Sequence, residues 1–381
     1  MLPLSDLEVT HYRGLRDLSL KDLGKVNLLV GPNNSGKTSV LEAISLVAAP
    51  LDPWTWISVA SRREPPGLGG NRRTLVERLR WMFPQHASQG PIANYGGSIG
   101  LSIAGPGPVR AVEARFQELR SAVEALPQRP APHDESTEDE LEISGERRGA
   151  KIDVEIGLGP DASSSKSRES FTWWEGERFV GPRHDGQRLR TQVITPYDHW
   201  YRGISARMYS QLRVEEAGED VIRLLSLVDP RIIGLEVLAA QPEAGAAVTP
   251  RAELYLRDRN AGLLPVDAFG DGMRRILLMA LGVTRARAGL LLIDEIETAI
   301  HVSALGHVFR WIVGACASNN VQLFATTHSL EALDAILAAD TTPEEDVVGY
   351  RLEARDAGVL AHRYSEDLLK RLRTERGIDV R

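Results

Sequence analysis

The spacing of apolar residues predicts strands at the start of the chain, and then a buried strand followed by a helix. Apolar residues alternate with polar ones on both sides of Tyr12-Arg13-Gly14, at Leu7, Val9, Leu18 and Leu20. This alternation is typical of two short strands. The continuous run 25–30 favours a buried strand. Beyond residue 38, apolar residues recur at helical spacing until Pro50 ends the pattern: Val40, Leu41, Ile44 and Val47.

The middle of the chain has a looser pattern that favours β structure. A helical stretch is predicted near 74–83, and alternation predicts strands near 99–103, 152–156 and 193–195. Residues 127–149 are rich in Pro, Glu, Asp and Arg. We expect this segment to be an exposed, mobile loop.

The last third of the chain returns to alternating helices and buried strands. Helices are expected over 205–228, ending before Asp229-Pro230, over a long segment through Met273 and Leu281, and over 305–317. Strands are expected near 232–238, 252–257, 289–293 and 321–325, followed by a hairpin over 347–364 and a helix from Ser365. We therefore predict an α/β fold whose mixed-sheet core is formed by residues 1–97 and 205–381, with an inserted antiparallel β-rich lobe at 98–204.

The segment between the first buried strand and its helix matches the phosphate-binding motif G-x-x-x-x-G-K-[ST] in full. Its residues are Gly31-Pro32-Asn33-Asn34-Ser35-Gly36-Lys37-Thr38. The glycines let backbone N–H groups surround an anion at a helix N-terminus, Lys37 would reach the β- and γ-phosphates, and Thr38 would bind Mg²⁺. We therefore predict an ATP site that includes Gly31, Asn33, Asn34, Ser35, Gly36, Lys37, Thr38 and Ser39.

Two carboxylates follow a later buried strand. Asp294 and Glu295 end the apolar run 290–293. A carboxylate at this position can hold Mg²⁺ directly or through water, which assigns Asp294 to the metal, and the next residue, Glu295, can polarise the attacking water. The alternative is that Glu295 only caps the next helix.

Two further segments complete the candidate site. His328 follows the buried strand 321–325 and could hydrogen-bond a γ-phosphate, although a structural role is the alternative. Gly270, Asp271 and Gly272 begin the long helix before the carboxylate strand, and such a helix N-terminus binds anions. This loop would serve the γ-phosphate of a second subunit, and an ordinary glycine loop is the alternative.

Composition and charge limit the function classes. The 381 residues are 43% hydrophobic and 25% charged, as in a soluble globular protein. No apolar run approaches the roughly 18 residues that span a bilayer, and the start of the chain is not a signal peptide. The single cysteine, Cys316, favours a reducing, cytoplasmic location.

The net charge of −7 provides no global attraction for nucleic acid. Arginine nonetheless outnumbers lysine, and arginines cluster at Arg62, Arg63, Arg72, Arg73, Arg78 and Arg80, and at Arg183, Arg188 and Arg190. Such a cluster can bind phosphates bidentately. Pairing with surface carboxylates is the alternative that we favour.

Together these motifs resemble the ABC-type ATPase heads, and more specifically the prokaryotic relatives of the OLD (overcoming-lysogenization-defect), SMC and RecF proteins. The resemblance implies an ABC-type head in which two copies sandwich two ATP molecules. It also implies that Gly270 to Met273 act on the partner's ATP and that Arg13 lies near the bound nucleotide. The signature serine of transporters is absent, and Gln85 and Gln89 are the candidates for the Q-loop.

The same resemblance excludes some members of the lineage. Between Lys37 and Asp294 there are no sustained heptads, so we expect no long coiled-coil arms. OLD nucleases carry an acidic metal-binding domain after the His motif, and the segment after His328 is too short for one, so we expect no nuclease activity in this chain.

We expect a slow, Mg²⁺-dependent ATPase that forms a homodimer through ATP and gates a separately encoded effector, such as a nuclease in anti-phage defence. The alternative is a RecF-like repair ATPase that binds DNA. In that case Arg62 to Arg80 would contact nucleic-acid phosphates.

Overall fold

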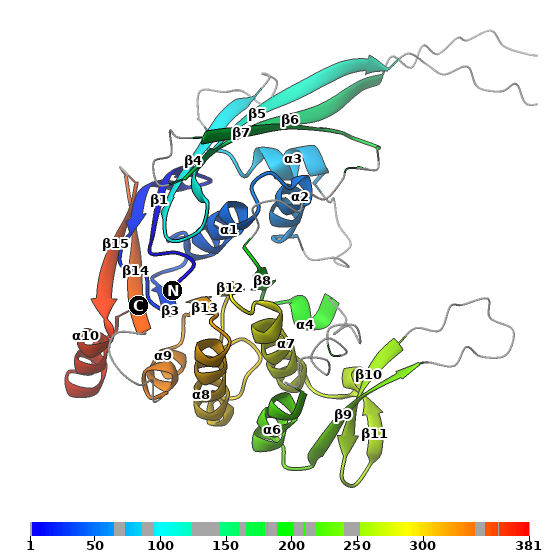
Figure 1. The fold of residues 1–381 in the computed structure, drawn as a ribbon, viewed down its shortest axis with the longest axis vertical. Coiled ribbons are helices and arrows are strands. Elements are labelled where there is room, and N and C mark those ends of the chain that lie inside the picture. The colour runs from blue at the N-terminus through cyan, green and yellow to red at the C-terminus, as the bar shows by residue number, and fades with distance from the viewer. Residues whose placement is uncertain are drawn as a thin grey trace, which may run out of the picture.

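The computed structural model contains two six-stranded sheets, a three-stranded sheet and the helices that cover them (Figure 1). It describes residues 2–64, 73–85, 95–123, 145–159, 165–177, 179, 181, 189–201, 209, 218–239, 252–339, 347–356 and 358–380. From top to bottom in Figure 1, an antiparallel sheet, a layer of helices, a mixed sheet and a second helical layer follow one another. The predicted fold class, an α/β core with an antiparallel β-rich region, is confirmed.

The mixed sheet forms the core of the molecule. Its strand order is β15-β14-β3-β13-β12-β8. The strands are β3 (Val26–Val30), β8 (Thr191–Ile194), β12 (Leu290–Ile293), β13 (Gln322–Thr326), β14 (Val347–Arg355) and β15 (Gly358–Ser365). All neighbours are parallel except the β14–β15 hairpin. Every residue of β3, β12 and β13 is buried, as expected for parallel strands covered on both faces.

Helices cover both faces of this sheet. α1 (Lys37–Ala48) lies on one side, and α7 (Asp271–Arg285), α8 (Val302–Ser318) and α9 (Leu330–Leu337) lie on the other (Figure 1). β3 leads directly into the loop before α1, and β12 and β13 end at the same edge because Ile293 pairs with Ala325 and Thr326 pairs with Leu29. The carboxyl ends of three strands therefore meet beside the start of α1.

The second sheet is antiparallel, with the order β2-β1-β4-β5-β6-β7. Its strands are β1 (Asp6–Tyr12), β2 (Leu15–Leu20), β4 (Gly96–Ala104), β5 (Val109–Val123), β6 (Gly145–Leu158) and β7 (Ser165–Trp174). It packs on α1, α2 (Pro53–Ser61) and α3 (Leu75–Arg80) through a cluster of buried aromatic side chains that includes Trp56, Phe83, Tyr95 and Phe116. The sheet therefore shares one apolar core with the helix that follows β3.

The predicted lobe at 98–204 is continuous with its neighbours. β1 pairs with β4, so N-terminal strands and lobe strands form one sheet, and β8 pairs with β12 in the mixed sheet. The division into three parts stays a prediction.

The prediction of a mobile loop at 127–149 is wrong for its last five residues, because β6 begins at Gly145 and pairs with β5. Residues 124–144 lie outside the described residues.

A smaller module lies beyond α7. α6 (Gly218–Val228) ends directly before Asp229-Pro230, as predicted, and is followed by the sheet of β9 (Ile232–Ala239), β10 (Ala252–Asp258) and β11 (Gly262–Pro265). Most of the predicted helix before residue 218 lies outside the described residues.

Short helices occur at α4 (Asp198–Tyr201), Val266–Ala268 and α10 (Glu366–Lys370), and a π-helical turn occupies Arg371–Glu375. In the described part of the chain, no helix is long and apolar enough to cross a membrane.

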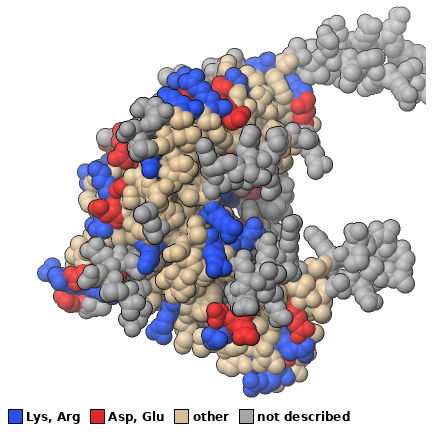
Figure 2. All heavy atoms as spheres, viewed as in Figure 1, with Lys and Arg blue, Asp and Glu red and all other residues tan. Residues whose placement is uncertain are grey.

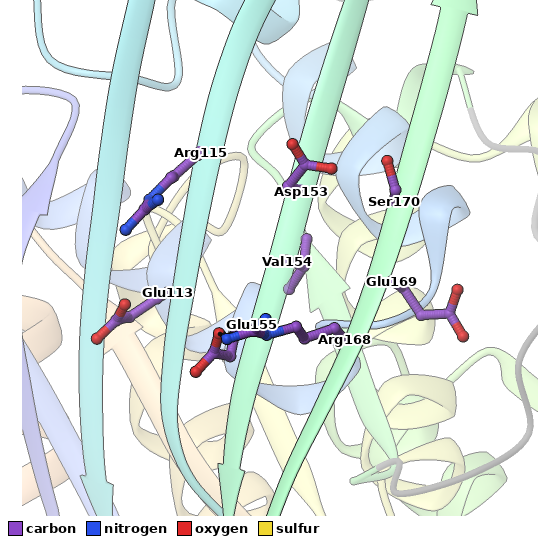
Figure 3. Close-up of a pocket in the computed structure, with 8 residues that line it drawn as sticks. All are labelled: Glu113, Arg115, Asp153, Val154, Glu155, Arg168, Glu169 and Ser170. Atoms are coloured by element: carbon purple, nitrogen blue, oxygen red, sulfur yellow. Dashed lines mark hydrogen bonds and ion pairs between the residues drawn. The ribbon is translucent and has the colours of Figure 1, made fainter.

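The outer face of the antiparallel sheet carries a shallow depression of about 460 Å³ (Figure 3). It is lined by charged side chains of β5, β6 and β7, including Glu113, Arg115, Asp153 and Arg168. Some of these charges pair across strands: Glu155 of β6 accepts from Lys166 and Arg168 of β7, each at 2.5 Å. Within β6, Lys151 contacts Asp153 at 3.1 Å. Cross-strand pairs of this kind stabilise a solvent-facing sheet surface.

A buried carboxylate on the inner face of β5 joins this sheet to α3. Glu118, 3% exposed, accepts from Arg80 at 3.2 Å and from Arg148 at 2.8 Å. We expect Glu118→Ala to lower the free energy of unfolding by about 2 kcal/mol, because it leaves two half-buried guanidinium groups without their carboxylate. Chemical denaturation would measure the change. Glu113→Ala, on the exposed face of the same strand, is the control, and an equal loss in both variants would contradict the prediction.

Candidate nucleotide-binding site

The loop between β3 and α1 has the backbone that an anion-binding nest requires. Asn34 has φ 63° and Gly36, the N-cap of α1, has φ 96°. Left-handed residues alternating with right-handed ones turn successive N–H groups toward one point. A Cβ on Gly36 would lie 2.5 Å from Leu15 Cδ2, and one on Gly31 would lie 2.5 Å from the carbonyl oxygen of Leu352. The loop is therefore fixed by β2 on one side and by β14 on the other.

Lys37 is folded back over this loop. Its Nζ donates to the carbonyl oxygens of Gly31 at 2.7 Å and Pro32 at 2.9 Å. Burial lowers the pKa of Lys37, whereas the carboxylates of Asp294 and Glu295 oppose that shift. A phosphate could replace the two carbonyls as the acceptor of the ammonium group.

The hydroxyl of Thr38 donates to the carboxylate of Asp294, at 2.9 Å to Oδ2 and 3.2 Å to Oδ1. Thr326, at the end of β13, donates to Asp294 Oδ1 at 2.6 Å. Burial raises the pKa of Asp294, although the two hydroxyl donors lower it. A half-buried carboxylate beside a threonine hydroxyl is a set of hard oxygen ligands that suits Mg²⁺.

Glu295 is held in a left-handed conformation next to Asp294. Its φ is 47°, its N–H donates to Thr326 Oγ1 at 2.7 Å, and its Oε2 accepts from Thr298 at 3.1 Å. The alternative that Glu295 caps the next helix is wrong: α8 begins at Val302 and its N-cap is His301. The turn between β12 and α8 instead leaves Glu295 facing a cavity.

This cavity has a volume of about 590 Å³. It brings together most of the residues predicted from sequence, namely Arg13, Asn33, Asn34, Ser35, Gly36, Lys37, Thr38, Ser39, Glu295 and His328. Gly31 and Asp294 lie behind this lining, where they bond to Lys37 and Thr38. Ser35 Oγ is buried and has no hydrogen-bond partner among the described residues. An unsatisfied hydroxyl inside a phosphate loop fits a site whose ligand completes the hydrogen bonding.

Two arginines in the cavity wall are held by one buried carboxylate. Glu42 of α1 accepts from Arg13 Nε at 2.7 Å and from Arg63 Nε at 2.8 Å, and Tyr12 donates to it at 3.2 Å. Arg63 also donates to Ser39 Oγ at 2.8 Å. The family resemblance placed Arg13 near the nucleotide, whereas the sequence named Arg63 only as one of a cluster of arginines and did not single out Glu42. A glutamate at a core-facing position of α1 was the available signal.

The C-terminal hairpin supplies another wall that sequence reasoning missed. Arg355, Gly358 and Val359 line the cavity, and β14 of the same hairpin adjoins the phosphate loop at Gly31. The backbone N–H of His328 donates to Glu297 Oε1 at 2.8 Å, which fixes the loop after β13.

The two glutamines named as Q-loop candidates do not line this cavity in the described part of the chain. The side chain of Gln85 donates to the carbonyls of Arg80 and Phe83, and Gln89 lies outside the described residues.

The glycine loop before α7 lies apart from this cavity. Gly270, Asp271 and Gly272 are not among the described residues that line it. Gly270 is the N-cap of α7, and Asp271 pairs with Arg274. Gly272 packs against the turn after Glu295, since a Cβ there would lie 2.8 Å from the carbonyl oxygen of Ala299.

The arginine-rich segment 62–80 is largely paired within the protein. Besides Arg63, contacts join Arg62 to Ser45 at 2.7 Å, Arg73 to Glu64 at 3.8 Å and Arg78 to Ser61 at 3.0 Å. Arg72, Arg183 and Arg188 lie outside the described residues. Basic and acidic atoms lie side by side at the upper and lower ends of the face in Figure 2. Carboxylates pair with Arg63, Arg73, Arg78 and Arg80, in line with the alternative that we favour. Two of these carboxylates, Glu42 and Glu118, are buried and do not lie at the surface.

Known proteins resemble parts of the chain. It is 32% identical over 114 residues to the uncharacterized protein MJECL11 of Methanocaldococcus jannaschii, a match to 29% of this chain and 98% of that protein. It is 47% identical over 47 residues to the DNA replication and repair protein RecF of Marinomonas sp., which covers 12% of this chain and 13% of RecF. A RecF of Vibrio cholerae is 46% identical over 46 residues, again 13% of its length.

Solved structures of SMC heads align over nearly the whole chain. An SMC head bound to the C-terminal winged-helix domain of ScpA covers 95% of this chain and 98% of its own, with 13% identity and a TM-score of 0.49. The SMC head domain from Thermotoga maritima covers 96% and 99%, with 14% identity and a TM-score of 0.42. No statement about activity or partners follows from similarity at this level.

A family model covers most of the chain, including the phosphate loop, both carboxylates and His328. It matches residues 26–334 and describes an "AAA domain, putative AbiEii toxin, Type IV TA system". The matched range begins at β3 and ends within α9, so it contains the core strands and helices around the cavity. The chain belongs to this family of AAA-domain proteins.

Proposed function

We propose that this chain is a Mg²⁺-dependent ATPase that closes into a homodimer around ATP and gates a separately encoded effector. The observation that carries the proposal is the contact of Thr38 with Asp294 at 2.9 Å. This contact joins the phosphate loop to the end of β12. The loop that would hold a phosphate therefore lies next to the carboxylate that would hold a metal. Glu295 follows Asp294 directly and faces the same cavity.

The residues present fit ATP and Mg²⁺. The nest at 33–38 and Lys37 would hold the phosphates, Thr38 and Asp294 would hold the metal, and Arg13 and Arg63 carry positive charge into the same cavity. Bound Mg²⁺ supplies charge neutralisation at the β- and γ-phosphates. The cavity of about 590 Å³ is within the range of sites that hold ligands of this size.

Glu295 is the residue that we assign to the attacking water. Its carboxylate faces the cavity, and the donor that holds it, Thr298, is a neutral hydroxyl. A carboxylate in this position can accept a proton from water and orient the water for attack on the γ-phosphate. His328 lines the same cavity, and we assign to it the role of donor to the γ-phosphate.

The position of the glycine loop supports the dimer. Gly270 to Gly272 begin a helix of 15 residues, whose N-terminus favours anions, yet they stand outside the cavity of their own chain. An anion site that its own nucleotide does not reach fits the phosphates of a second copy. In the proposed dimer, one chain contributes the phosphate loop and the carboxylates to each site, and the other chain contributes Gly270 to Gly272.

The effector is inferred from the family. Its description names a toxin and a type IV toxin–antitoxin system, which supports a role in a two-component system of the kind used in anti-phage defence. Because such a system has two components, we assign the second activity to a separately encoded protein.

A RecF-like DNA-binding role is the less favoured alternative. The matched segment covers 13% of each RecF protein. Of the arginines that would contact DNA, Arg63, Arg73 and Arg80 are paired with Glu42, Glu64 and Glu118. Duplex binding measured across a salt series would revive this alternative if it gave a steep negative slope.

Glu295→Gln should trap ATP and stabilise the dimer. The amide cannot accept a proton from water, so turnover should fall by about 100-fold or more while nucleotide binding persists. Light scattering in ATP and Mg²⁺ should then show a lasting dimer, whereas wild type should return to monomer as ADP accumulates. Glu253→Gln, on the exposed surface of β10, is the control. A Glu295→Gln protein that stays monomeric at saturating ATP and Mg²⁺ would refute the proposed dimer.

Gly36→Ala should abolish nucleotide binding. Gly36 has φ 96°, and its Cβ would lie 2.5 Å from Leu15 Cδ2, so the loop must change shape. We expect the dissociation constant for ATP, measured by calorimetry, to rise by about 100-fold because the nest loses its geometry. Gly306→Ala, in α8 with open space around it, is the matched control. Unchanged affinity in Gly36→Ala would mean that ATP binds elsewhere.

A further inference from the structure

Arg275 is a fully buried arginine in the second turn of α7. Its relative exposure is 0%, and it is a charged residue among the buried apolar residues of the same helix. Its guanidinium donates to main-chain oxygens at the ends of two core strands: Nη1 to Thr195, and Nη2 to Asp294 at 2.9 Å and Glu295 at 3.1 Å. One side chain of α7 therefore binds the backbone of both residues assigned to the metal and the water.

The charge of Arg275 persists in this setting. Burial lowers the pKa of Arg275 to about 10, and nearby carboxylates, first Asp198 and then Asp294, raise it. At neutral pH the group is a cation. A buried charge is costly unless it is hydrogen-bonded. The planar guanidinium group of an arginine can donate to several carbonyl oxygens at once, and the ammonium group of a lysine is less suited to this geometry.

The turn that Arg275 contacts is strained. Glu295 has φ 47° and Ala299 has φ 64°, and neither is glycine. Such residues persist only where their surroundings hold them. Here the Glu295 N–H is held by Thr326 at 2.7 Å and its carbonyl by Arg275, while Gly272 packs against the carbonyl of Ala299.

We propose that Arg275 is a positioning residue that fixes the backbone of Glu295 and couples the first turn of α7 to it. The inference rests on the proposed ATPase function for its catalytic consequence. Gly270 to Gly272 lie within five residues of Arg275 at the start of the same helix. A displacement of this turn by the nucleotide of a partner subunit would move the carbonyl of Glu295. Occupancy of one site of the dimer is thereby transmitted to the water-activating residue of the other.

The first test uses the protein without nucleotide. Arg275→Lys and Arg275→Ala should each increase amide hydrogen exchange in peptides that cover 294–300 by about tenfold or more, because the strained turn loses its anchor. Arg285→Ala, an exposed arginine at the other end of α7, is the matched control and should leave exchange unchanged. Unaltered exchange at 294–300 in a folded Arg275→Lys protein would overturn the proposal, whatever the enzyme's activity.

The second test measures ATP turnover. Arg275→Lys should lower kcat by about 10- to 100-fold with KM for ATP changed by less than about threefold, since misplacement of the water-orienting group affects the chemical step. In single-turnover assays, adding Arg275→Lys to Glu295→Gln should cause little further loss, because Arg275 acts through Glu295. A multiplicative loss in the double variant would overturn the coupling.

Chemical rescue separates positioning from folding. Methylguanidinium should restore at least part of the kcat of Arg275→Ala and leave Arg285→Ala unaffected. Absence of rescue in a protein that melts as a folded chain and binds ATP would count against the positioning role. Wild-type protein that binds no ATP, or that binds but never hydrolyses it, would overturn the proposed function itself, and the exchange test would still decide whether Arg275 holds the turn.

Discussion

The structure depends on the parallel register of three buried strands. β3, β13 and β12 are fully buried and paired so that their carboxyl ends reach the same edge of the sheet. In a sheet of this kind, ligands bind beyond those ends. The register brings Thr38, which follows β3, within 2.9 Å of Asp294, which follows β12, although the two residues are far apart in the chain. A shift of β12 by one residue would turn its side chains to the opposite faces of the sheet and move Asp294 away from Thr38.

Buried charges carry out the finer positioning around this edge. Glu42 holds Arg13 and Arg63 against the phosphate loop, and Arg275 holds the carbonyls of Asp294 and Glu295. Each charge is hydrogen-bonded on several sides, so that the cost of burial is offset and the geometry is restricted to one arrangement. The apolar core alone would tolerate many side-chain positions at this edge, whereas these networks specify one.

The local prediction succeeded where one signal dominated. The buried runs at β3, β12 and β13 and the helix after the phosphate motif follow directly from hydrophobic pattern and motif. α2 was missed although Asp52-Pro53 is a helix start, and the side chain of Asp52 caps it. The loop predicted at 127–149 failed at its end because charged residues such as Arg148, which pairs with Glu118, occupy strand positions there. Polar composition suggested a loop, but cross-strand pairing with a buried carboxylate decided the structure.

By itself, the sequence determined the phosphate loop, the carboxylates of Asp294 and Glu295 and the α/β class, because these follow from short segments whose chemistry and periodicity are local. Only the tertiary structure placed Arg63 and Arg355 in the cavity wall and Arg275 on the carbonyl of Glu295. It also excluded the capping role of Glu295, since α8 begins after His301. Some of these contacts join elements that are close in sequence, as Arg275 does with Glu295 at a separation of 20 residues. They are fixed by strand register and helix packing, which no local pattern encodes.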